Sequence, residues 1–139
     1  MSIRNALNRR TYLKAMAGAL PAVPAAQMAK GAAAPPIQLH CDLYLDGKRE
    51  KEMLDNYRNV FRPAIKQQPG FAAVTMLKLR QEVQGKGPAG CSHRLIISFE
   101  TEEARKKWVA TPTHQKVWPT VENTLLGPKY IALLYDPVE

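Results

Sequence analysis

The chain has 139 residues, of which 45% are hydrophobic and 23% charged, and its formal net charge is +8. This length and composition fit one ordinary globular domain with a terminal extension. Residues 1–36 hold five of the 20 basic residues and no acidic one, so the other 15 basic and 12 acidic residues leave only +3 beyond them. Those charges alternate in sign along the chain instead of forming one basic face, and we therefore expect no nucleic-acid partner.

The first 36 residues are predicted to be an export signal and a linker. Residues 8–14, Asn-Arg-Arg-Thr-Tyr-Leu-Lys, resemble a twin-arginine signal, and a short apolar run and a small-residue stretch follow them. The apolar run of about 12 residues is shorter than the roughly 20 of a membrane-spanning helix, so no membrane span is expected. The resemblance implies a periplasmic or secreted protein. Cleavage after Ala25 or nearer Ala34 remains open, and so does a frayed basic helix on a cytoplasmic protein.

The pattern of apolar residues predicts a strand and then a helix after this linker. From residue 37 to 46 every second residue is apolar, which is the period of a strand. Gly47 predicts a turn, and the apolar residues between 48 and 65 have helical spacing. Pro63 is expected to kink this helix or break its last turn. Pro69 and Gly70 predict its end.

Two more strands, a second helix and a last strand complete the predicted domain. The strands cover residues 71–80, 93–100 and 129–136. Thr101 is expected to cap the second helix, and Thr111-Pro112-Thr113 to interrupt it. Its apolar stripe continues through Leu125, and Gly127-Pro128 is expected to stop it.

This order of elements predicts an α+β fold for residues 37–139. Strand, helix, strand, strand, helix, strand is the βαββαβ order of a ferredoxin-like domain, in which a four-stranded antiparallel sheet carries two helices on one face. The helices are expected to cover the side of Leu39, Leu43, Leu77, Ile97 and Leu133. The other side would expose Tyr44, Val74, Met76, Ile96, Tyr130 and Leu134. Such an apolar face predicts a homodimer in which the two sheets face each other.

Residues 37–136 resemble the antibiotic-biosynthesis-monooxygenase type of dimeric α/β barrel. The resemblance rests on the order of elements, on Pro69-Gly70-Phe71, and on the segment from Phe99 to His114 with its Trp108 and Thr111-Pro112. It implies a dimeric barrel that acts on a small aromatic of the phenol or quinol type without a cofactor. Some members use an Asn on the first strand, where this chain has Cys41 or His40. Haem-degrading members place a ligand His where Trp118 stands.

Five residues are candidates for the site. His114 lies beside the helix break and is a candidate general base, because its ordinary pKa is near neutrality. Trp108 is the second candidate for the catalytic site, as a flat wall for an aromatic ligand. His40, Cys41 and Trp118 are candidates for substrate binding. Each residue also has a structural interpretation. His114 could cap the restarted helix or bond a carbonyl, and His40 could be a satisfied polar group. Trp108, Trp118 and Cys41 could simply pack in the core.

The function therefore has two open interpretations. The first is a monooxygenase-like oxidoreductase, and the second is a non-catalytic barrel that binds a small apolar ligand or serves as an interaction module. Packing of Trp108 on Trp118 would favour the second, and an open cavity lined by His114 would favour the first. The three histidines are too dispersed in the sequence to predict a metal site. His93 is expected at the surface, and a Cys41–Cys91 disulfide is possible without being required.

Overall fold

Four strands and two helical regions follow one another in the predicted order. The computed structural model describes residues 34–139, so the predicted export signal lies outside the described residues. The strands are β1 (Ile37–Leu45), β2 (Phe71–Lys78), β3 (His93–Phe99) and β4 (Leu125–Tyr135). They form one sheet in the order β2-β3-β1-β4, and every neighbouring pair is antiparallel. The chain therefore has the predicted ferredoxin-like α+β fold.

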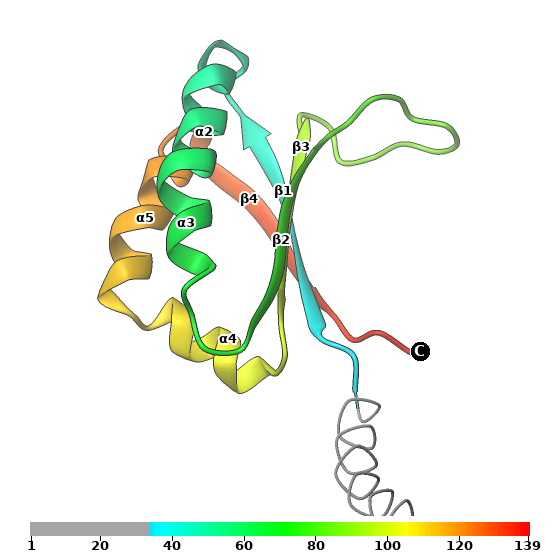
Figure 1. Cartoon of the computed structure of the whole chain (residues 1–139). Coiled ribbons are helices and arrows are strands. Elements are labelled where there is room, and N and C mark those ends of the chain that lie inside the picture. The colour runs from blue at the N-terminus through cyan, green and yellow to red at the C-terminus, as the bar shows by residue number, and fades with distance from the viewer. Residues whose placement is uncertain (1–33) are drawn as a thin grey trace, which may run out of the picture. The chain divides into compact units, whose positions relative to one another are not determined.

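Both helical regions cover the same face of the twisted sheet, as Figure 1 shows. The first comprises η1 (Gly47–Arg49), α2 (Glu50–Asn56), η2 (Tyr57–Phe61) and α3 (Arg62–Ile65). The second comprises α4 (Glu102–Val109) and α5 (Pro112–Glu122). The loop between β2 and β3 extends away from the sheet on the side opposite the helices (Figure 1). We call the side of the sheet without helices the open face.

The first helical region absorbs Pro63 through a π-helical turn. The N–H of Arg62 donates to the carbonyl of Tyr57, five residues earlier, because η2 has the wider π-helical spacing. Proline has no N–H to donate and its ring crowds the preceding turn, so a widened turn just before it relieves both problems. The predicted disturbance at Pro63 is thus a local widening, and the helical region continues to Ile65.

The second helical region is broken where the sequence predicts the break. Thr101 caps α4 by accepting from the N–H of Ala104 at 3.1 Å, and Thr111 caps α5 in the same way. The prediction that this helix runs to Gly127 is wrong. It ends at Glu122, and Leu125 already pairs with Leu45 in the sheet. Gly127 has φ +74° within β4. It therefore allows an irregularity in the strand, where the pairing with β1 shifts register, and does not mark the end of a helix.

The strand register shows which residues share a face. Cys41 and Leu95, which are paired and buried, face the helices, and their partners Ala132 and Met76 must face the same way. The prediction for β1 and β3 is therefore confirmed, whereas that for β2 and β4 is wrong by one residue. Val74, Met76, Tyr130 and Leu134 face the helices, and Leu77, Ile131, Leu133 and Tyr135 lie on the open face with Tyr44 and Ile96.

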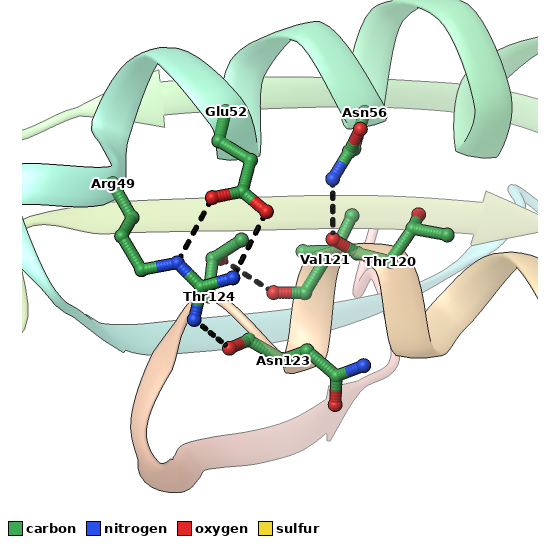
Figure 2. A network of polar contacts seen from close by, with 7 residues as sticks. All are labelled: Arg49, Glu52, Asn56, Thr120, Val121, Asn123 and Thr124. Carbon is green, nitrogen blue, oxygen red and sulfur yellow. Dashed lines mark hydrogen bonds and ion pairs between the residues drawn. The ribbon is translucent and has the colours of Figure 1, made fainter.

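A polar network ties the two helical regions together (Figure 2). The guanidinium of Arg49 donates twice to Glu52, at 2.9 Å each, and once to the carbonyl of Asn123 at 2.6 Å. Asn123 is the C-cap of α5, so a cation sits where helix carbonyls lack intrahelical partners. Asn56 donates to the carbonyl of Thr120 at 2.8 Å. These bonds fix α5 against α2 and thereby set the space between helices and sheet.

Candidate functional site

A cavity of about 400 Å³ lies between the helix-facing side of the sheet and the second helical region. A volume of this size is in the range of small-molecule sites. Strands β1, β3 and β4 form one wall, and η2, α4 and α5 form the other. The lining is mostly apolar and aromatic, with a few polar groups: Leu39, Cys41, Phe61, Ile97, Arg105, Trp108, Val109, His114, Trp118, Tyr130, Ala132 and Leu134.

His114 is held at this cavity by the helix break. The hydroxyl of Thr111 accepts from the N–H of His114 at 3.0 Å and donates to the carbonyl of Trp108 at 2.7 Å. One side chain thus fixes the end of α4 and the start of α5. Pro112 suits the first turn of α5 because the missing N–H would have no partner there.

The imidazole of His114 is half-buried, and one of its ring nitrogens lacks a hydrogen-bond partner among the described residues. That nitrogen, Nδ1, is buried. Burial lowers the pKa of His114 below its ordinary value of 6.5, because the charged form loses solvation. The ring is therefore neutral at neutral pH. His114 lines the cavity, and a neutral imidazole there can accept a proton from a bound ligand.

Aromatic rings form the rest of the wall. The ring of Phe61 meets Trp108 edge-on with centroids 6.0 Å apart, and meets Trp118 edge-on at 5.8 Å. Trp118 also meets Tyr130 edge-on at 5.3 Å. Both tryptophans line the cavity together with His114. Such a surface can hold a flat aromatic molecule by stacking and edge contacts.

Cys41 lies in the cavity wall but is unsuited to nucleophilic chemistry. It is only 3% exposed, and burial raises its pKa to about 12. The thiol is therefore protonated at any physiological pH, and only a thiolate attacks efficiently. Cys41 can contact an apolar ligand as a small hydrophobic group. Cys41 and Cys91 are both free thiols, so the possible disulfide is absent.

Sequence reasoning missed Arg105 and Tyr130. Arg105 lies on α4, lines the cavity and makes two bonds to Glu102, of 2.6 and 2.7 Å. Its position among alternating charges predicts a solvated helix face instead. Tyr130 was expected on the wrong side of the sheet, because β4 is apolar on both sides. The three-residue spacing of Glu102 and Arg105 was the available signal for an ion pair, although not for its place at the cavity.

His40 does not belong to this cavity. It lies on the open face of the sheet, where its Nε2 is 3.0 Å from Oε1 of Gln38 and its ring meets Tyr135 edge-on at 4.8 Å. Burial first, and then the charge of Arg94, lowers the pKa of His40. The sheet stands between His40 and His114. The structure therefore brings together His114, Trp108, Trp118 and Cys41 and separates His40 from them.

The described part of the chain lacks a metal centre and a membrane-spanning helix. Residues 34–139 contain no group of three His, Cys, Asp or Glu side chains arranged to hold a metal ion. No helix within that range is long and apolar enough to cross a membrane.

Comparison with known proteins shows that this chain shares its fold with several solved structures. No family model matches the chain, and no curated protein matches it either. A dimeric ferredoxin-like protein of unknown function from Jannaschia has 11% identity and a TM-score of 0.62, covering 74% of this chain and 100% of the other. A mutant of SnoaB, a cofactor-independent oxygenase from Streptomyces nogalater, has 15% identity and a TM-score of 0.61, covering 76% and 96%.

A third solved structure has the same arrangement. It is a candidate antibiotic biosynthesis monooxygenase from Caulobacter crescentus, with 12% identity and a TM-score of 0.60, covering 81% of this chain and 99% of the other. At such identities the similarity shows a common fold. The chain has the fold of antibiotic-biosynthesis-monooxygenase-like and dimeric ferredoxin-like proteins.

Proposed function

We propose that the protein is a cofactor-independent monooxygenase-like enzyme that oxidises a small electron-rich aromatic of the phenol or quinol type. The observation that carries the proposal is the cavity of about 400 Å³ that His114 lines together with aromatic side chains. The fold shared with an oxygenase and a candidate monooxygenase supports the same reaction class.

The proposed reaction needs only the substrate and molecular oxygen. His114 takes the phenolic proton, and the resulting phenolate is electron-rich enough to reduce oxygen. For a phenol with a free para position, one O₂ is consumed, one oxygen atom enters the ring carbon as a quinone carbonyl and the other leaves as water. The phenol supplies all the electrons that this reduction requires, so no separate reductant takes part.

His114 moves the proton, and the remaining groups hold the substrate. Trp108 and Trp118 flank the ring of the substrate, and Arg105 at the same cavity favours the anionic phenolate over the phenol. The pair with Glu102 keeps the guanidinium of Arg105 in place. Cys41 contributes an apolar contact. In this proposal the chain needs no resident cofactor.

We also propose a homodimer formed through the open face, in a periplasmic or secreted protein. The open face exposes Leu77, Leu133 and Tyr135 by 47–49% each, next to the half-buried Ile96 and Ile131. Covering these side chains with a second copy removes apolar area from water. Two solved structures of the same fold are described as dimeric. The export proposal rests on the twin-arginine-like residues 8–14.

The experiment is a screen of phenols and quinols under air, with oxygen consumption and quinone absorbance as readouts. The full chain should consume oxygen with at least one substrate, and His114→Ala should lower the rate by about 10²-fold or more, the usual contribution of a general base. His40→Ala is the matched control and should leave the rate unchanged. The proposal would be contradicted if both variants lost the same amount of oxygen-consumption rate, or if His114→Ala lost none.

The same screen tests the non-catalytic alternative. If phenols quench tryptophan fluorescence and His114→Ala weakens the quenching, yet no oxygen is consumed, the cavity binds ligands without catalysis. The mostly apolar and aromatic lining of the cavity is the observation that favours this second candidate.

A further inference from the structure

We propose that Ser92, His93 and Glu50 form a second reactive site, a nucleophile–base–acid relay that hydrolyses small carboxylic esters. The relay lies where β3 begins, between the end of β2 and the start of α2, and it shares no residue with the cavity of His114. It is therefore independent of the proposed oxygenase function. His93 was predicted to lie at the surface, but its side chain is only 2% exposed.

Three contacts assemble the relay. Oγ of Ser92 lies 2.8 Å from Nδ1 of His93, and Nε2 of His93 lies 3.1 Å from Oε2 of Glu50. Nζ of Lys78 lies 2.8 Å from the same Glu50 oxygen. The carboxylate can only accept, so Nε2 carries the proton and Nδ1 accepts from the hydroxyl of Ser92. A hydroxyl bonded to a base that a carboxylate orients is the arrangement of an activated serine nucleophile.

The protonation states suit this role. Burial lowers the pKa of His93, against the opposing effect of Glu50, so the imidazole is neutral and able to accept a proton. The ammonium of Lys78, and then His93, lowers the pKa of Glu50 and keeps the carboxylate ionised. When His93 receives the proton of Ser92, the charge of Glu50 stabilises the imidazolium that forms.

A cavity of about 330 Å³ lies beside the nucleophile. Ser92 and His93 line it together with Arg80 and with the loop residues Gly87 and Pro88. Arg94, which also lines it, is already engaged by two bonds to Asp42, of 2.7 and 3.2 Å. The guanidinium of Arg80 is therefore the available cation for the oxyanion of a tetrahedral intermediate. Leu79, which follows the end of β2, gives the same cavity an apolar part for a short acyl group.

The proposed step balances without an oxidant or reductant. Oγ of Ser92 attacks the ester carbonyl carbon while its proton passes to Nδ1 of His93. The carbon–oxygen bond to the alcohol then breaks, and the alcohol leaves with the proton from His93. Water attacks the acyl-serine with His93 again as base, which releases the carboxylic acid and restores the free hydroxyl.

The test uses the full chain with p-nitrophenyl acetate. We expect a burst of nitrophenolate of about one equivalent per chain, because acyl-serine accumulates before it is hydrolysed. Tandem mass spectrometry of the quenched burst should locate the acetyl group on Ser92. Ser92→Ala should lower the rate by about 10²-fold or more. Ser98→Ala, the same substitution on β3 outside the cavity, should leave the rate unchanged.

Further variants distinguish Ser92 from the other nucleophiles of the chain. Cys91→Ala should retain the burst, because the neighbouring thiol is not the nucleophile. Glu50→Gln should lower the rate while His114→Ala leaves it unchanged. A fluorophosphonate should label the wild type at Ser92 alone. Acetylation of Cys91 or of a lysine in place of Ser92, or a full rate in a folded Ser92→Ala variant, would overturn the proposal.

Discussion

The imidazole of His114 meets the indole of Trp108 edge-on, with ring centroids 5.0 Å apart and planes at 83°. The two residues belong to different helices, and the break at Thr111 turns them toward each other. A continuous helix would place residues six apart on different faces, because each residue advances by about 100°. The break is therefore what brings a candidate base to a candidate aromatic wall.

We predict that Thr111→Val lowers activity more than its loss of stability explains. The variant removes the hydroxyl that bonds both Trp108 and His114, so the imidazole loses its fixed position. Loss of an N-cap costs about 1 kcal/mol of stability. Turnover of the aromatic substrate should fall about tenfold or more, since a misplacement near the reacting atoms is costly. Thermal melting and oxygen consumption measure the two effects.

Thr101→Val is the matched control for this prediction. Thr101 caps α4 with the same geometry, accepting from Ala104 at 3.1 Å, but it does not line the cavity of His114. Both variants should lose stability, Thr111→Val somewhat more because its hydroxyl makes a second bond, but only Thr111→Val should lose turnover. Equal turnover in both would show that Thr111 has no positioning role.

We predict that stability decreases as the pH falls from about 7 to 5. The pKa values of His40, His93 and His114 are all lowered in the folded protein, mainly by burial, from an ordinary value of 6.5. Below that ordinary value the unfolded chain therefore binds more protons than the folded one, which favours unfolding. Well above it all three are neutral in both states, so stability is constant there as far as histidines contribute.

Melting temperatures measured between about pH 5 and 8 check this prediction. His114→Ala should reduce the slope of stability against pH by no more than the contribution of one bound proton, because one titrating group has been removed. The sign of the slope should stay the same. A second loss of stability should follow below pH 4.5, since ion pairing also lowers the pKa of Glu50 and Glu102 from that value. Stability that rises on acidification over the histidine range would contradict the burial of these histidines.

We predict that Leu133→Glu dissociates the proposed homodimer. Leu133 is 49% exposed on the open face, beside His40, with which it pairs. A buried unpaired carboxylate costs several kcal/mol, so the dissociation constant should rise by about 100-fold or more. Val60→Glu, which places the same charge on the helical side, should not affect it. Sedimentation or light scattering at micromolar concentration gives the result, and an unchanged dimer would exclude the open face as the interface.

We predict that Gly70→Ala destabilises the protein more than Gly85→Ala. Both glycines have positive φ, of 79° and 74°, which costs an alanine about 1 kcal/mol. A Cβ at Gly70 would lie 2.7 Å from the Cβ of Ala104, whereas a Cβ at Gly85 meets nothing within 4 Å. Overpacking adds about 1–3 kcal/mol at Gly70 alone. Urea unfolding of both variants measures the difference, and equal losses would contradict the close approach of α4.

Local signals in the sequence were enough to predict the order of elements, the fold class and the break in the second helical region. These depend on local signals, namely the alternation of residues 37–46, the caps at Thr101 and Thr111, and the proline at 112. Local signals predict well because backbone preferences and capping act within a few residues. They also identified His114 and Trp108 as neighbours of the break, which the structure places at one cavity.

The faces of β2 and β4 that meet the helices depend on how the strands pair in the folded sheet. Both strands are apolar on both sides, so the sequence pattern fits either face equally well. The hydrogen-bonded register with β1 and β3 fixes which residues of β2 and β4 face the helices. That choice placed Tyr130 in the cavity of His114 and left Leu133 on the open face. It was also tertiary packing, through contacts between residues far apart in the chain, that separated His40 from His114 and joined His93 to Glu50.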